Sequence, residues 1–145
     1  MALTSTFVFM LELSNKNTFT KEEKLCSTKA IDTLFSVGES FVAYPLRVVY
    51  VIHDEFEFDR QNVSVMISVS KRKFKRAVKR NRVKRLIREA YRLNKQGLIT
   101  LLNRQNKGMD IAFLYLKDEL PEFAEIEKSI LKAMSILTDK MEKER

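Results

Sequence analysis

The most concentrated chemistry in this chain is a run of fixed positive charge. Twelve lysine and arginine residues lie between Lys71 and Arg92, and Glu89 is the only acidic residue among them. Like charges at helical spacing repel each other by roughly a few tenths of a kcal/mol per pair, so this density destabilises the isolated chain. Because arginine and lysine side chains bind phosphate oxygens, the run predicts a surface that binds a polyanion.

The positive charge is local and does not extend over the whole protein. The run contributes 12 − 1 = +11, whereas the whole chain carries +8, so the remaining residues sum to −3. A basic patch on a slightly acidic background is the electrostatic footprint of a polyanion-binding site.

Other residue types that could perform chemistry lack partners at a readable spacing. Cys26 is the only cysteine, which excludes an intramolecular disulfide, and we expect it to be a small buried hydrophobe. His53 stands at a predicted strand end without a metal-ligand pattern, so we expect a structural or surface role. Ser64, Ser68 and Ser70 alternate on a strand without the glycines of a nucleophile elbow. We therefore predict no catalytic residue and no metal ligand.

The basic run predicts an amphipathic helix preceded by a basic arm. Val83, Leu86, Ile87 and Ala90 form a narrow apolar stripe at helical spacing. At about 100° per residue, a single arc opposite that stripe holds Asn81, Lys84, Arg85, Arg88 and Arg92. The arm that precedes the helix holds Lys71, Arg72, Lys73, Lys75 and Arg76. A merely solvated helix face is the alternative, but it would mix acidic and basic residues, as the C-terminal segment does.

The rest of the chain supplies the elements that must position this helix. A helix is expected from Thr20, a capping residue, to Gly38, which closes it. The segment 41–53 reads as β structure interrupted at Pro45, either as two short strands or as one edge strand with a bulge. Residues 63–70 alternate as a half-buried strand, and a short helix, a buried strand and a long helix follow the basic helix.

These elements give an α+β fold in the order αβββαβα, a single-domain α/β sandwich. With 145 residues and 45% hydrophobic content, the chain is long enough for one core. We expect residues 1–19 to be an N-terminal extension, disordered or packed as a stray strand, and residues 20–145 to be the domain. No apolar run reaches membrane-spanning length, and residues 1–15 lack the positive region of a signal peptide, so we expect a cytoplasmic protein without a membrane partner.

The stretch ISVSKRKFKRAVKRNRVKRLIREAYR, residues 67–92, resembles the signature of the bacterial ribonuclease P protein subunit. In that family a strand ending in Ser-Lys is followed by a basic arm and a motif with fixed Arg, Asn and Lys positions. The matching positions here are Ser70, Lys71, Arg80, Asn81, Arg82, Lys84, Arg85 and Arg88. The resemblance covers roughly residues 21–140.

The resemblance implies a function and a set of site residues. The family's protein binds a catalytic RNA, which supplies the active site and binds the Mg²⁺, and helps it remove the 5′ leader of precursor tRNA. The endoribonuclease activity would belong to the RNA, and no further protein partner is implied. The implied RNA-binding residues are Lys71, Arg72, Lys73, Lys75, Arg76, Lys79, Arg80, Asn81, Arg82, Lys84, Arg85, Arg88 and Arg92.

The family also holds the leader in a cleft between its first helix and the sheet, and it contains a left-handed βαβ crossover. By position, the implied cleft residues are Ile31, Phe35, Val48 and Tyr50, with Ile31 where relatives often carry an aromatic. Stacking of single-stranded bases would be the role of the aromatics. A core role is the alternative for Phe35 and Tyr50, because both lie in apolar runs.

Two other functions stay open at this point. One is a structural RNA-binding protein of the ribosomal type, which would bind RNA without affecting leader cleavage. The other is a self-sufficient nuclease that uses Asp54, Glu55 and Glu57 as metal ligands.

Overall fold

The computed structural model describes residues 23–54 and 62–143. Within them the element order is α2 (Thr28–Val37), β1 (Glu39–Ala43), β2 (Leu46–His53), β3 (Val63–Ser68), α3 (Ala77–Asn94), α4 (Gln96–Gln105), β4 (Gly108–Tyr115) and α5 (Phe123–Lys143). This confirms the predicted α+β fold and its order, with α4 as the predicted short helix. The predicted N-terminal extension, residues 1–19, lies outside the described residues.

The described strands form one sheet in the order β1-β2-β4-β3. β1 and β2 are an antiparallel hairpin joined at a cis Tyr44–Pro45 peptide, so the two-strand reading of segment 41–53 is confirmed. β2 and β4 are antiparallel, whereas β3 and β4 are parallel. The crossover from β3 to β4 runs through α3 and α4, and its left-handedness stays a prediction of the resemblance.

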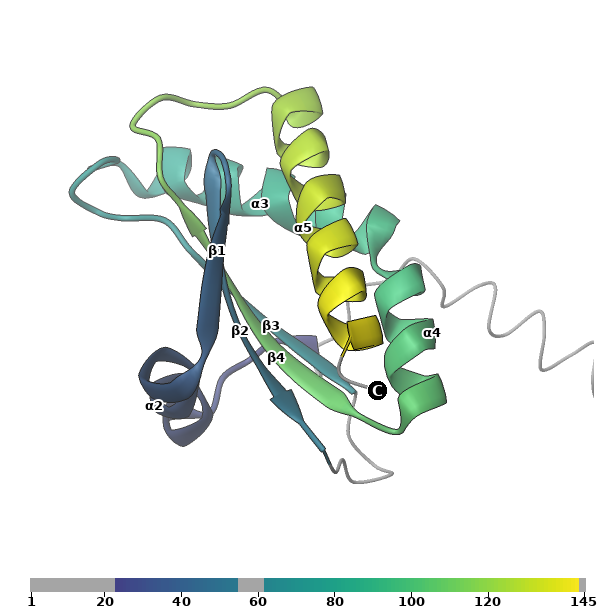
Figure 1. The fold of residues 1–145 in the computed structure, drawn as a ribbon. Coiled ribbons are helices and arrows are strands. Elements are labelled where there is room, and N and C mark those ends of the chain that lie inside the picture. The colour runs from purple at the N-terminus through teal and green to yellow at the C-terminus, as the bar shows by residue number, and fades with distance from the viewer. Residues whose placement is uncertain (1–22, 55–61, 144–145) are drawn as a thin grey trace, which may run out of the picture.

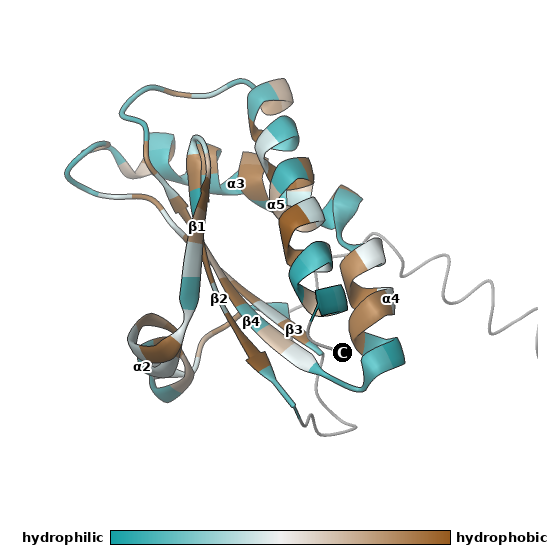
Figure 2. Cartoon of the chain, in the orientation of Figure 1, coloured by the Kyte–Doolittle hydropathy of each residue, from teal (hydrophilic) through white to brown (hydrophobic). Residues whose placement is uncertain are grey.

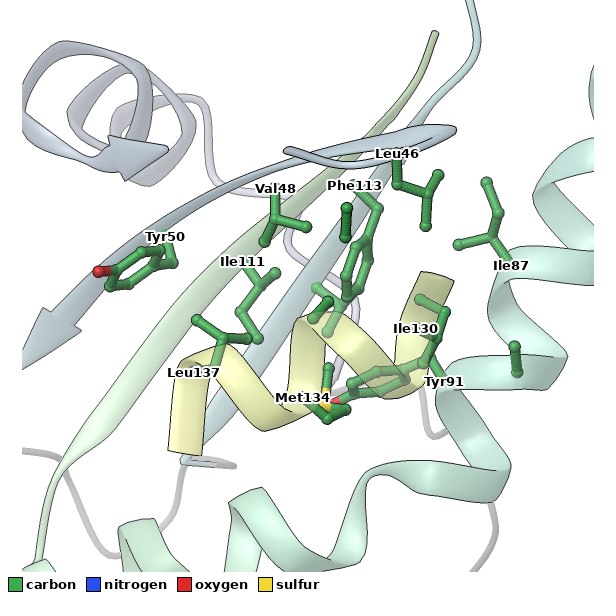
Figure 3. Packing of buried hydrophobic residues seen from close by; sticks show 14 of the residues in the cluster. Leu46, Val48, Tyr50, Ile87, Tyr91, Ile111, Phe113, Ile130, Met134 and Leu137 are labelled. Carbon is green, nitrogen blue, oxygen red and sulfur yellow. The ribbon is translucent and has the colours of Figure 1, made fainter. Parts of the chain in front are cut away.

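Helices cover both faces of the sheet, as Figure 1 shows: α3, α4 and α5 lie on one side and α2 on the other. We call these the α5 face and the α2 face. The main core fills the α5 face, where Val48, Tyr50 and Phe113 of the sheet approach Ile130 and Leu137 of α5 (Figure 3). A smaller cluster on the α2 face joins the sheet to α2 through Leu34, Val49 and Ala112.

The first helix begins later than the sequence predicts. Thr20 lies outside the described residues, and α2 starts at Thr28, where the Ser27 side chain accepts a hydrogen bond from the Ala30 N–H. Its end at Gly38 is confirmed, since the Gly38 N–H donates to the Leu34 carbonyl over 3.0 Å. A Cβ at residue 38 would lie 2.2 Å from that carbonyl oxygen, which explains why the position holds glycine.

Glu23, expected within the first helix, instead forms a buried ion pair. Its carboxylate lies 2.7 Å from the Lys95 ammonium, and both residues are buried. Lys95 connects α3 to α4, and Leu25 hydrogen-bonds to Val65 of β3. The segment before α2 is therefore tied both to the edge of the sheet and to the end of the basic helix.

Candidate RNA interface

The predicted basic arm, residues 71–76, is an ordered turn anchored by one aromatic side chain. The Phe74 side chain is 4% exposed, and its ring centroid lies 6.0 Å from that of Tyr115. The Ser70 carbonyl accepts from the Phe74 N–H over 3.1 Å, and the Ser70 hydroxyl accepts from the Arg72 N–H over 3.1 Å. Burial of Phe74 thus holds the arm while its basic side chains point outward, and Figure 2 shows the arm as mostly hydrophilic.

Two of the predicted RNA-binding cations, Arg80 and Lys73, donate to backbone carbonyls of the protein. The Arg80 guanidinium donates to the Phe74 carbonyl over 2.8 Å and to the Lys75 carbonyl over 3.0 Å. The Lys73 ammonium donates to the Leu116 carbonyl, which follows β4. These contacts hold the middle of the arm, at Lys73 to Lys75, against β4 and the start of α3.

Helix α3 has the predicted division between its faces. Val83, Ile87 and Ala90 are fully buried in the main core. All the predicted basic and amide positions reach the surface to some degree. The exposed ones are Lys71, Arg72, Lys73, Lys75, Arg76, Lys79, Asn81, Arg82, Arg85 and Arg88, and the half-buried ones are Arg80, Lys84 and Arg92. We call the basic arm and the exposed face of α3 together the cationic surface.

The single acidic residue in this surface is neutralised by its neighbour. The Glu89 carboxylate accepts from the Arg92 Nε over 3.1 Å and also pairs with Arg92 Nη2. This hydrogen bond lowers the pKa of Glu89 and raises that of Arg92, so the pair stays charged and its net charge is close to zero. The rest of the cationic surface carries net positive charge, and on one side the basic arm adjoins the carboxylates of Asp118 and Glu119.

The α2 face carries two of the four predicted leader-cleft residues. Ile31 is half-buried against the sheet, and Phe35, 47% exposed, lies one turn later on α2. The sheet presents Val49 and Val51 to the same helix. A surface with an exposed aromatic ring beside apolar strand residues suits the stacking of single-stranded bases.

The predicted positions of the other two cleft residues are wrong. Val48 is 0% exposed and Tyr50 is 3% exposed, and both belong to the main core on the α5 face, opposite α2 (Figure 3). The Tyr50 hydroxyl donates to the Glu39 carboxylate over 2.6 Å. Neighbouring strand residues point to opposite faces, so the α2 face carries Val49 where the prediction has Val48 or Tyr50. The core alternative therefore holds for Tyr50.

Sequence reasoning missed one cation on the α2 face. Arg47 of β2 is exposed, and in the sheet register it lies between Val42 of β1 and Leu114 of β4, with Ser68 of β3 next in the row. This row is two residues from Ser70, after which the basic arm starts. A lone arginine within the apolar strand was the available signal.

The remaining candidates have structural surroundings. The His53 ring lies 2.9 Å from the Asp110 carboxylate, consistent with the expected structural role. Cys26 is exposed, so its expected burial is wrong. Asp54 is exposed and lies 3.8 Å from the Lys107 ammonium, while Glu55 and Glu57 are outside the described residues. In residues 23–54 and 62–143 we find no group of three His, Cys, Asp or Glu side chains placed to hold a metal ion.

None of the described helices is long and apolar enough to cross a membrane.

Comparison with known proteins agrees with this geometry. The sequence model of the family Ribonuclease P matches residues 19–138. The "Ribonuclease P protein component" of Porphyromonas gingivalis is 46% identical over 114 residues, covering 79% of this chain and 82% of that protein. The protein of the same name from Chlorobium phaeobacteroides is 34% identical over 126 residues, covering 81% and 86%.

Solved structures show the same fold. The RNase P protein of Staphylococcus aureus superposes with a TM-score of 0.60 at 20% identity, covering 79% of this chain and 94% of that one. The RNase P protein from Thermotoga maritima superposes with a TM-score of 0.59 at 22% identity, covering 79% and 96%. The match over most of the chain confirms the resemblance found in residues 67–92, and this chain belongs to the ribonuclease P protein family.

Proposed function

We propose that this chain is the protein subunit of ribonuclease P, which binds the catalytic RNA and the 5′ leader of precursor tRNA and so promotes removal of the leader. The observation that carries the proposal is the continuity of two surfaces. The row holding Arg47 and Ser68 on the α2 face leads through Ser70 into the basic arm at Lys71. One RNA strand can therefore contact both the α2 face and the cationic surface.

The cationic surface is the part that binds phosphates. Its exposed guanidinium groups stand on a helix whose backbone is already ordered, so binding restricts only their side-chain rotamers. At the start of α3, Arg76 in the capping position makes no side-chain cap within the described residues, which leaves backbone amides for a phosphate. Neutralising phosphates by these groups releases counterions, so binding should weaken steeply with salt.

The α2 face is the part that binds the leader. The exposed Phe35 and the half-buried Ile31 on α2, with the half-buried Val51 on the sheet, offer apolar contact to bases, and Arg47 offers one cation to the backbone. With Ile31 in place of a second aromatic, stacking depends mainly on Phe35. Phe35 binds only a segment that is single-stranded, as a leader is, because paired bases cannot stack on a side chain.

Catalysis in this proposal belongs to the RNA, which also binds the Mg²⁺. The exposed part of α3 is cationic and repels a free divalent ion, so these residues do not suit a metal site of their own. Lys and Arg side chains beside phosphate-dense RNA reduce its self-repulsion, and this lowers the Mg²⁺ concentration that the RNA needs. The polypeptide contributes charge and positioning, and we place its action in the cytoplasm, with the transcript that it helps to mature.

Cleavage of a precursor tRNA by the host's catalytic RNA at low millimolar Mg²⁺ tests the proposal. We expect strong activation when the protein is added and no cleavage by the protein alone. A Mg²⁺ titration should shift to lower concentration with protein. Tight RNA binding without activation would overturn the proposal and favour a structural RNA-binding role, and efficient cleavage by protein alone would favour a nuclease.

A further inference from the structure

A surface hollow of about 600 Å³ lies where three loops meet at one end of the sheet. The loops are the β1–β2 turn, the basic arm and the β4–α5 connection, and Figure 1 shows them gathered at the same end. The side chains around the hollow are those of Tyr44, Arg72, Lys73, Leu116, Lys117, Asp118 and Glu119. This mixture of an aromatic ring, cations and carboxylates was not singled out by the sequence.

The walls of the hollow are held in place by hydrogen bonds around Leu116. Its N–H donates to the Pro45 carbonyl over 2.8 Å, which fixes the β1–β2 turn. Its carbonyl accepts from the Lys73 ammonium, which fixes the basic arm. The Tyr115 hydroxyl donates to the Glu119 carbonyl over 2.6 Å, which fixes the β4–α5 connection.

The Tyr115 hydroxyl keeps its proton over the physiological pH range. Burial, with a smaller contribution from the charge of Glu125, raises the pKa of Tyr115 to about 12. The donor that holds the Glu119 carbonyl is therefore constant, and the shape of the hollow is set before any ligand binds.

The side chains that face the hollow have few contacts of their own. Tyr44 is 64% exposed at the tip of the turn. Among the residues that the structure describes, the Tyr44 hydroxyl, the Arg72 guanidinium and the carboxylates of Asp118 and Glu119 make no hydrogen bond or ion pair. Lys117 differs, because its ammonium is paired with Glu125 at 2.8 Å.

These free groups match the base and the phosphate of a nucleotide. An exposed aromatic ring stacks on a base, and a guanidinium binds a phosphate. Carboxylates repel phosphate but accept hydrogen bonds from the amino group on the edge of a base, as acidic side chains do from cytosine. A ligand that is only an anion would not explain Asp118 and Glu119.

The position of the hollow also favours RNA. A neighbouring hollow of about 460 Å³ shares Lys73, Asp118 and Glu119 with it and continues along Lys75 and Lys79 to the start of α3. A strand that leaves the first hollow can therefore follow these lysines to the cationic surface, along a path that Asp118, Glu119 and Leu120 also line.

We propose that this hollow binds one nucleotide of single-stranded RNA, with its base on Tyr44, its phosphate on Arg72, and an amino group of the base at Asp118 or Glu119. The inference rests on the proposed function, because it assumes an RNA partner. It predicts a preference for adenine, cytosine or guanine over uracil, which lacks an exocyclic amino group.

Binding of labelled short oligoadenylate and oligouridylate to the full chain, measured by fluorescence anisotropy, tests the inference. We expect tighter binding of oligoadenylate, a loss of about tenfold in Tyr44→Ala, and almost no loss in Tyr44→Phe, which keeps the ring. In a double variant, Asp118→Ala with Glu119→Ala, binding of oligouridylate should tighten and the preference should vanish. An equal melting temperature shows that each variant is folded.

Two further measurements identify the source of the strand. If Tyr44→Ala weakens the binding of precursor tRNA to an extent that depends on leader length, the hollow binds precursor tRNA. If Tyr44→Ala weakens only the binding of the catalytic RNA, the hollow binds that RNA. Unchanged binding in Tyr44→Ala would overturn the inference, and a loss in Arg85→Gln in the same assay would show that the proposed function survives. Failure of the wild type to bind any of these RNAs would overturn both.

Discussion

The cationic surface and the α2 face are built from opposite kinds of side chain, although we propose that one RNA substrate contacts both. On α3, charged groups stand on a helix whose apolar stripe packs into the main core. On the α2 face, apolar and aromatic groups surround a helix that buries only Leu34 fully, and Arg47 is the added cation. The exposure of a charged side chain can be predicted from its residue type. An apolar side chain packs in the core or binds a ligand depending on which face of its helix or strand it occupies.

Substitutions in the two regions should therefore affect different properties of the protein. Removing a charge from the cationic surface should weaken binding and leave the fold intact. Removing an apolar residue near the α2 face should alter either folding or leader binding, depending on which side of the sheet it occupies. The following predictions test that division, starting with the largest effect.

Tyr50→Ala should destabilise folding and have no specific effect on the leader. Tyr50 is buried against α5, so its truncation leaves a cavity and removes a hydrogen bond to Glu39, whose carboxylate keeps its 3.9 Å ion pair with Lys140. We expect a loss of about 3–5 kcal/mol in the free energy of unfolding, measured by chemical denaturation. Unchanged stability, combined with weaker binding only of substrates that carry a leader, would place Tyr50 in the leader cleft again.

The error in placing Tyr50 has a physical cause in the sequence of β2. The strand is central and covered on both faces, so Leu46, Val48 and Tyr50 alternate with Val49 and Val51, and both sets are apolar. Apart from Arg47, which lies on the face of Val49 and Val51, such a strand shows no polar alternation that could reveal its phase. In β3, by contrast, serines alternate with valines, and the predicted half-buried strand is confirmed, with Val63 and Val65 as its buried residues.

Other parts differ in predictability for related reasons. The order of the elements and the arc of α3 follow from local periodicity, and both are confirmed. The start of α2 does not follow from local periodicity, because Glu23 pairs with Lys95, which lies 72 residues further along the chain. The hollow at Tyr44 likewise depends on three loops that only the folded chain brings together.

Arg85→Gln should weaken RNA binding without affecting stability. Arg85 is exposed on α3 and makes no hydrogen bond or ion pair within the described residues, so the loss is that of a phosphate contact. We expect about 1.5–3 kcal/mol less binding free energy for the catalytic RNA. The slope of log affinity against log salt should flatten by roughly 0.7–0.9. Lys132→Gln on the exposed side of α5 is the matched control and should change neither quantity.

Phe35→Ala should act on the leader alone. Because Phe35 is about half exposed, its loss removes little core packing, and α2 keeps Leu34 as its anchor. We expect binding of precursor tRNA with a leader to weaken by about 1–3 kcal/mol. Binding of mature tRNA should hardly change. Val37→Ala, on the last residue of the same helix, controls for general loss of exposed apolar surface. Equal losses for both tRNAs would argue against base stacking.

Arg80 gives the smallest effect and the finest test, because it lies in the cationic surface but its contacts are internal. Its guanidinium holds two carbonyls of the basic arm, so Arg80→Lys keeps the charge but loses that pair of hydrogen bonds. We expect Arg80→Lys and Arg80→Gln to weaken RNA binding similarly, by about 0.5–1.5 kcal/mol, since either change loosens the arm.

The salt dependence separates this positioning role from a direct phosphate contact. If Arg80 acts through the arm, the slope of log affinity against log salt should stay unchanged in Arg80→Lys, and the other cations should still bind. Lys79→Gln, an exposed neighbour, should instead flatten the slope, because that ammonium is free to reach a phosphate. Full affinity in Arg80→Lys with a flattened slope in Arg80→Gln would show that the charge of Arg80, rather than its two carbonyl contacts, is what RNA binding requires.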